Sequence, residues 1–94
     1  MQVKWLAKAL KNLDAEAEYI GEENLQAARA FVQTVWDAAQ SLAQNPSIGR
    51  PGRVLGTREL VIDGFQYIVP YRVKEDQVQI LRVFHTRRKL PKRW

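Results

Sequence analysis

The sequence predicts an α+β domain in which an N-terminal strand and an antiparallel helical hairpin pack on an antiparallel sheet of about four strands. Two apolar stripes at helical spacing occupy the first half, and alternating apolar and polar residues occupy the second. A loop rich in proline and glycine separates the two halves. The expected order, strand–helix–helix–strand–strand–strand, is typical of α+β proteins. No repeat or linker divides the chain, so we expect residues 1–94 to form one domain.

The first half predicts a short strand followed by two helices. Residues 2–6 alternate in polarity, and from about residue 7 to residue 20 apolar residues recur every three or four positions. Gly21 is expected to end this helix as a left-handed C-cap. Asn24 is the expected N-cap of the second helix, whose apolar stripe extends over residues 25–42. The short connecting loop requires the two helices to run antiparallel.

The second half predicts a loop and then three strands. Residues 45–57 contain two prolines and three glycines and form the expected loop. Strands are expected at residues 58–62, 65–73 and 78–84. Asp63-Gly64 favours a two-residue hairpin turn between the first two of these strands. Pro70 has no N–H donor, so we expect it at a bulge or at a position without a ladder hydrogen bond.

The composition excludes several classes of chemistry. The chain has no cysteine and one histidine, and its acids are scattered, so we expect neither a disulfide nor a metal site. We expect no cofactor. No apolar run approaches the roughly 20 residues that cross a bilayer. A cytoplasmic protein without a membrane partner is the expectation.

The net charge of +5 is distributed unevenly along the chain. Residues 1–48 carry four cations against six acids, a balance of −2, whereas residues 49–94 carry eleven cations against four acids, a balance of +7. A half-molecule with this charge is suited to an anionic partner such as nucleic acid, the ribosome or an acidic protein segment. The alternative is that the surplus charge serves only solubility.

The cations of the second half have two interpretations. Those within strands, at positions 58, 72 and 82, could pair across the sheet with the acids at positions 59, 75 and 76. The cations beyond the last strand have no acid near them in sequence, and they form the expected binding surface: Arg87, Arg88, Lys89, Lys92 and Arg93. Arg50 and Arg53 join this set as candidates, although their glycine-rich loop lacks the Walker spacing.

His85 is the one side chain suited to acid–base chemistry near neutral pH. A neutral His85 could act as a base, while Arg58, Arg82 or Arg87 stabilises a charged phosphate transition state, as in a metal-free ribonuclease. Alternatively, His85 ends a strand and hydrogen-bonds a neighbour. The residues alone leave both interpretations open.

Three stretches of sequence carry a family resemblance. They are LAQNP with GRPG (residues 42–46 and 49–52), GTREL with YIVPYRV (56–60 and 67–73), and VQILRVFHTRR (78–88). In these stretches, and in their order, the chain resembles the RelE/ParE superfamily of toxins from bacterial type II toxin–antitoxin modules.

The resemblance implies one of two activities. RelE-type members cut mRNA in the ribosomal A site without a metal, and in that case Arg58, Arg87 and His85, supported by Arg82, would be the catalytic residues. ParE-type members inhibit DNA gyrase and are not hydrolytic enzymes. The basic residue expected in the third strand of RelE-type members falls near Gln66 or Tyr67, and the C-terminal tyrosine is missing, so both departures argue against RNA cleavage. The long paired helices and the run Arg82-Val83-Phe84-His85 at the end of the last strand resemble the ParE-like branch more.

The resemblance also implies the partners. We expect a cognate antitoxin, acidic and partly disordered, that forms a hetero-oligomer with the toxin, and we expect DNA gyrase, or alternatively the ribosome and mRNA, as the target. A non-toxic nucleic-acid-binding module is the third interpretation of the same cations.

Overall fold

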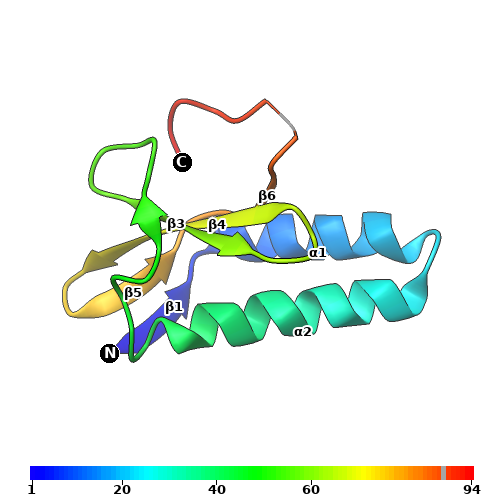
Figure 1. Cartoon of the computed structure of the whole chain (residues 1–94), viewed down its shortest axis with the longest axis horizontal. Helices are drawn as coiled ribbons and strands as arrows, with labels where there is room; N and C mark the ends of the chain where they lie inside the picture. The colour runs from blue at the N-terminus through cyan, green and yellow to red at the C-terminus, as the bar shows by residue number, and fades with distance from the viewer. Residues whose placement is uncertain (88) are drawn as a thin grey trace.

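The computed structural model describes residues 1–87 and 89–94, and these form a helical hairpin packed on one face of a small sheet (Figure 1). The elements in chain order are β1 (Gln2–Trp5), α1 (Ala7–Gly21), α2 (Leu25–Ser41), β2 (Arg50–Pro51), β3 (Arg58–Ile62), β4 (Tyr67–Lys74), β5 (Gln77–Ile80) and β6 (Phe84–His85). The expected α+β class and the order of its main elements are confirmed.

The sheet is mixed, whereas the sequence predicts an antiparallel one. The six strands are ordered β1-β5-β4-β3-β2, with β6 also paired to β4. β1 pairs parallel to β5, and all other pairs are antiparallel. An antiparallel partner for β1 would be β4, which runs in the opposite direction. However, the two edges of β4 are already occupied by its hairpin neighbours β3 and β5. The edge left for β1 therefore belongs to a strand that runs in the same direction as β1.

The last predicted strand is divided by a bulge. Its two parts, β5 and β6, are separated by residues 81–83, and the backbone N–H groups of Leu81 and Arg82 both donate to the Pro70 carbonyl, at 2.9 and 3.4 Å. Two residues thus face one across the ladder, which defines a β-bulge. Of the two kinds of position expected for Pro70, the structure has the bulge.

The predicted two-residue turn at Asp63-Gly64 is wrong. The connection between β3 and β4 has four residues, 63–66, and the half-buried Phe65 turns its ring edge-on to Phe31 at 5.5 Å between centroids. A two-residue turn could not place that ring in the core. The two-residue turn is instead at Glu75-Asp76, where both residues have positive φ.

Of the two helix caps that the sequence predicts, the structure confirms one. The Asn24 side chain accepts a hydrogen bond from the Ala27 N–H at 3.0 Å, as an N-cap does. Gly21 is not a left-handed C-cap. It is the last residue of α1, and the helix closes when the Glu22 N–H donates to the Glu18 carbonyl at 3.1 Å.

The core lies between the helical hairpin and the inner face of the sheet. It contains fully buried side chains from both layers, among them Ala9, Phe31, Val35, Val69, Tyr71 and Ile80. Because successive strand residues point to opposite faces, the cross-strand pairs Glu59–Pro70 and Ile68–Phe84 belong to the outer face. In Figure 1 the segment after β6 passes over the sheet on the side opposite α2.

Candidate cationic interface

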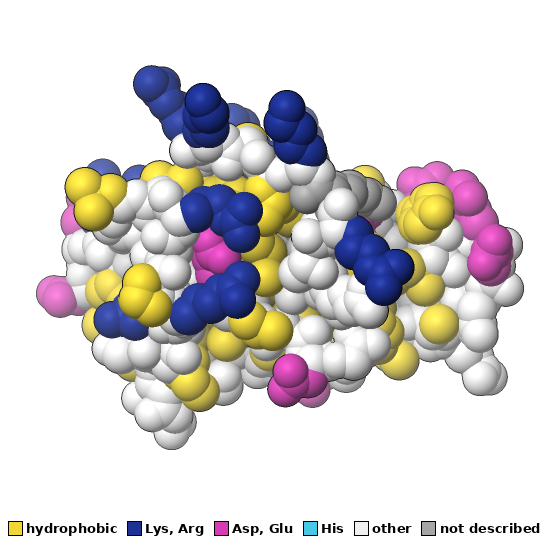
Figure 2. All heavy atoms as spheres, turned by 45° about the horizontal axis from the view of Figure 1, so that its top comes forward, with side chains coloured by type: hydrophobic (Ala, Val, Ile, Leu, Met, Phe, Trp, Pro, Cys, Tyr) yellow, Lys and Arg dark blue, Asp and Glu magenta, His cyan; other side chains and the backbone are white. Residues whose placement is uncertain are grey.

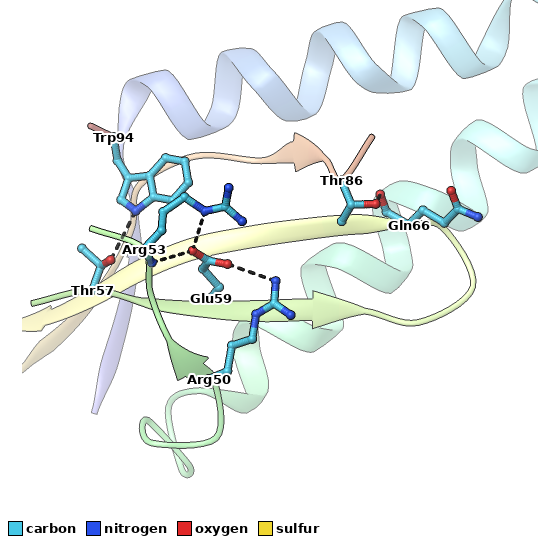
Figure 3. Close-up of polar contacts among 7 residues, drawn as sticks. All are labelled: Arg50, Arg53, Thr57, Glu59, Gln66, Thr86 and Trp94. Atoms are coloured by element: carbon cyan, nitrogen blue, oxygen red, sulfur yellow. Dashed lines mark hydrogen bonds and ion pairs between the residues drawn. The ribbon is translucent and has the colours of Figure 1, made fainter. Parts of the chain in front are cut away.

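The outer face of the sheet is organised around one buried carboxylate, Glu59 on β3. Its side chain is only 2% exposed. Arg50 is its cross-strand partner in β2, and the Arg50 guanidinium donates to Glu59 Oε1 at 3.1 Å. The following loop returns Arg53 to the same carboxylate, and the backbone N and Nε of Arg53 donate to Oε2 at 2.9 and 3.1 Å (Figure 3). Three donors therefore satisfy this buried acid.

Glu59 remains ionised at neutral pH. Burial by itself raises its pKa, but the hydrogen bonds from the Arg53 backbone and from the Arg53 and Arg50 side chains outweigh burial, and the pKa lies below the ordinary value of 4.5. Two arginines and one carboxylate leave one net positive charge. The side chains of Arg50 and Arg53 are 54% and 44% exposed, so this charge is accessible to a partner.

The segment after β6 adds further cations to the same face. Arg87, Lys89, Lys92 and Arg93 are all exposed. In the part of the chain that the structure describes, both ion pairs involve Glu59, so none of these four cations is paired with an acid. Arg88, the remaining member of the predicted set, lies outside the described residues.

We use the term cationic surface for Arg50, Arg53, Arg87, Lys89, Lys92 and Arg93. Figure 2 shows lysine and arginine side chains gathered over this side of the molecule, with an acidic side chain between two of them. Such a concentration of net positive charge attracts an anionic partner and orients its approach.

The strand arginines do not pair with acids across the sheet, so that interpretation is wrong for the described residues. Arg58 on β3 donates to the carbonyls of Ser47 and Gly49, at 3.3 and 2.7 Å. Arg72 donates from Nε to Gln79 Oε1 at 2.8 Å.

Arg82, at the bulge, also has no acidic side chain among its acceptors in the described residues. It donates from Nε to Asn12 Oδ1 at 2.7 Å and from its guanidinium to the Trp94 carbonyl at 3.2 Å. Its guanidinium lies 4.4 Å from the ring centroid of Phe84. These contacts connect the bulge that precedes β6 to α1 and to the end of the segment that follows β6.

His85 on β6 is half-buried and already engaged. Its Nδ1 accepts a hydrogen bond from the Arg87 N–H at 3.1 Å, and its ring lies edge-on to Tyr67 at 5.0 Å between centroids. A neutral imidazole whose Nδ1 is an acceptor carries its proton on Nε2. The contact with Arg87 therefore occupies Nδ1, the acceptor nitrogen of that ring.

The four candidate catalytic residues do not converge on one point. Arg58 is opposite Tyr71 on β4 and His85 is opposite Tyr67, a separation of four residues or about 13 Å along the strand. Arg82 donates to Asn12 of α1. The structure brings together only Arg87 and His85, through a backbone contact.

Sequence reasoning missed the residues that hold the cationic surface together: Asn12, Thr57 and Trp94. Glu59 was considered only as a partner for strand arginines. One signal was visible in the sequence, namely that Trp94 is an isolated aromatic at the end of a run of cations. Its partners lie far away in the chain, and no local pattern identifies them.

Other features of the described residues are not part of this surface. A hollow of about 570 Å³ lies between α1 and α2, lined by residues such as Ala17, Ala28 and Val32, and it contains none of the candidate residues. In the described ranges no cluster of three or more potential metal ligands occurs. The same ranges contain no helix that is long and apolar enough to cross a membrane.

The chain, with its helical hairpin on one face of the sheet, is a member of the RelE/ParE superfamily of toxins. The family model described as the ParE toxin of the type II toxin–antitoxin system parDE matches residues 3–90. The chain therefore belongs to the ParE toxin family, and it is the toxin of a type II toxin–antitoxin system. Membership of this family implies a cognate antitoxin partner.

Individual relatives agree with this assignment. The chain is 40% identical over 90 residues to the putative toxin Y4kP of Sinorhizobium fredii, covering 96% of this chain and 93% of that protein. It is 37% identical over 87 residues to toxin RelE2 of Caulobacter vibrioides, covering 93% and 97%. A solved structure of the chromosomal ParDE system from P. aeruginosa superimposes with a TM-score of 0.81 and 33% identity, covering 90% of this chain and 95% of that one.

Proposed function

We propose that this toxin arrests growth in the cytoplasm by binding DNA gyrase and inhibiting it, with the cationic surface as the contact region. The observation that carries the proposal is a ParE-type fold whose outer face presents unpaired cations. The scattered positions of Arg58, Arg82 and His85 support binding over hydrolysis, because nuclease chemistry requires its catalytic groups around one phosphate.

The test is gyrase supercoiling of relaxed plasmid in the presence of the purified protein. We expect inhibition, together with an increase in gyrase-dependent DNA cleavage. The double variant Lys92→Ala/Arg93→Ala should raise the half-inhibitory concentration about tenfold, which corresponds to about 0.7 kcal/mol for each lost contact.

The matched control is Lys8→Ala/Lys11→Ala, which removes the same charge from exposed positions on α1. It should inhibit gyrase as well as the wild type does. If both double variants lose inhibition equally, the effect depends on the total charge of the protein and not on the cationic surface. Unchanged supercoiling with the wild type would reject gyrase as the target.

A second candidate function is ribosome-dependent mRNA cleavage, favoured by the 37% identity to a relative named toxin RelE2. It predicts cuts at the A site in a translating extract, reduced by about 10²-fold or more in His85→Ala, the usual scale of acid–base contributions. Intact mRNA in that extract at toxin concentrations that stop gyrase would exclude it.

We infer that the cognate antitoxin is an acidic, partly disordered chain that covers the cationic surface. Four unpaired cations beside the Arg50–Glu59–Arg53 group provide charge complementarity to such a segment. The same cations that contact the target would then be neutralised in the inactive complex. Purified complex should therefore fail to inhibit gyrase until the antitoxin is removed.

A further inference from the structure

The last residue of the cationic segment, Trp94, is held at four points by groups from separate parts of the fold. Its indole Nε1 donates to Thr57 Oγ1 at 3.2 Å (Figure 3). Its ring lies against Phe84 at 5.6 Å between centroids. The Arg53 guanidinium lies over the ring at 5.9 Å, and Arg82 donates to the Trp94 carbonyl at 3.2 Å. The side chain is thus half-buried on the outer face of the sheet.

Three of these partners, Arg53, Arg82 and Thr57, are themselves fixed by a second contact. Arg53 is bound twice by the buried Glu59. Arg82 is bound by Asn12 of α1, and the Thr57 hydroxyl donates to the Val54 carbonyl at 2.6 Å. Trp94 is therefore connected to groups that the body of the domain already holds in place.

The other end of the segment is also tied down. The backbone N–H and the hydroxyl of Thr86 both donate to the Gln66 carbonyl, at 2.8 and 2.9 Å (Figure 3). Between these two ends, residues 89–93 belong to no helix or strand. Leu90 in this stretch is half-buried, but in the described part of the chain Lys92 and Arg93 make no side-chain hydrogen bond or ion pair of their own. Their position therefore depends largely on the contacts of Trp94.

We propose that Trp94 is the positioning residue of the cationic surface. It holds Lys89, Lys92 and Arg93 beside Arg50 and Arg53, so that an acidic polypeptide meets one ordered surface and not a mobile arm. Ordering the cations before binding removes part of the entropy cost of binding. This inference rests on the proposed function in that the acidic polypeptide would be a carboxylate-bearing segment of the target or of the antitoxin.

The first test is limited trypsin digestion of the full chain, because the segment contains its own cleavage sites. In Trp94→Ala, cleavage after Arg87 and Lys89 should become about tenfold faster or more, since proteolysis follows the population of the opened state. Trp94→Phe retains a ring against Phe84 and Arg53 but loses the indole N–H, so its rate should be intermediate.

The internal control is cleavage after exposed cations of the helices, Lys8, Lys11 and Arg29, in the same digest. These rates should stay as in the wild type. If all sites accelerate together, Trp94 acts on global stability and the positioning role is overturned. If cleavage in the segment is unchanged in Trp94→Ala, the proposal is equally overturned.

The second test is binding of fluorescently labelled poly-L-glutamate as the carboxylate probe. Trp94→Ala leaves the net charge of +5 unchanged, yet it should weaken binding about three- to tenfold, with Trp94→Phe again intermediate. Equal affinity in all three proteins would contradict the proposal. Tighter binding of a duplex DNA oligonucleotide than of poly-L-glutamate would contradict the choice of an acidic polypeptide as partner.

Neither test uses gyrase, so the two proposals can fail separately. Protein that leaves gyrase untouched but shows the predicted effects of Trp94→Ala rejects the proposed target and supports the positioning role. Protein that inhibits gyrase but shows no effect of Trp94→Ala on digestion of the segment or on poly-L-glutamate binding supports the target and overturns the positioning role.

Discussion

At the scale of single residues, Glu59 determines how the outer face is built. It is an acid on a strand, buried beside two arginines, and its three hydrogen bonds bring β2 and the loop after it onto the sheet. A buried carboxylate without donors would be strongly unfavourable, so the arginines and Glu59 depend on one another.

We predict that Glu59→Gln lowers the free energy of unfolding by about 1–3 kcal/mol at neutral pH, the scale of hydrogen bonds to a charged group. The pKa of Glu59 is depressed on folding, so its stabilisation is present above pH 4.5 and is lost as the pH falls through the lower folded value. Urea unfolding at a series of pH values measures this, and Glu59→Gln should lack that acid-dependent part.

The control for this prediction is Glu75→Gln, at an exposed position in the β4–β5 turn. It should unfold like the wild type at neutral pH. Equal acid dependence in wild type and Glu59→Gln would show that Glu59 does not titrate as described.

At the scale of elements, one tyrosine connects the sheet to the loop that precedes β2. The buried hydroxyl of Tyr71 donates to the Pro46 carbonyl at 2.8 Å and accepts from the Gly49 N–H at 2.9 Å. Burial raises the pKa of Tyr71, although the Gly49 N–H and the charge of Arg58 act in the opposite direction, so the phenol stays neutral and able to donate. This contact places Arg50 and β2 against Glu59.

We predict that Gly49→Ala destabilises the fold by about 2–4 kcal/mol through overpacking and lost hydrogen bonds. A Cβ at Gly49 would lie 2.6 Å from both Cε1 and the hydroxyl oxygen of Tyr71, so the loop or the ring would have to move. Thermal unfolding followed by circular dichroism measures the change. The exposed neighbour Ile48→Ala should cost little, and a similar loss there would contradict a role for the tight contact.

At the scale of the whole molecule, the unequal charge of the two halves predicts how a partner approaches. Residues 49–94 carry a balance of +7 and residues 1–48 a balance of −2. The described part of the cationic segment lies over the outer face of the sheet, and the helical hairpin covers the inner face. The positive charge is therefore concentrated on the side of the molecule that carries the cationic surface. An acidic chain should be steered toward that side, the outer face of the sheet.

We predict that the association rate constant with the cognate antitoxin falls about tenfold or more from low to high ionic strength, as electrostatically steered encounters do. Stopped-flow fluorescence measures the rate. Lys92→Glu/Arg93→Glu should slow association and flatten its salt dependence, whereas Lys8→Glu/Lys11→Glu on α1 should have a much smaller effect. A rate that is independent of salt would refute steering.

The positive charge of the candidate site was predictable from the sequence, but the contacts that hold its residues in place were not. The exposed cations at positions 87, 89, 92 and 93 follow directly from a sequence run without acids. Arg50 and Arg53 were expected to be available to an anion, and the structure places them on a carboxylate of their own chain. That pairing depends on the register of β2 against β3, which a two-residue strand in an irregular loop does not reveal in sequence.

The sequence by itself determined the α+β class, the helical hairpin, the Asn24 cap and the bulge at Pro70, because these depend on periodicity and backbone chemistry over a few residues. Only the tertiary structure decided the parallel pairing of β1 with β5, the partners of Glu59 and the position of Trp94. Trp94 meets Thr57 across 37 positions of the chain, and Arg82 meets Asn12 across 70. Contacts of this kind depend on how the layers assemble, and no short stretch of sequence contains that information.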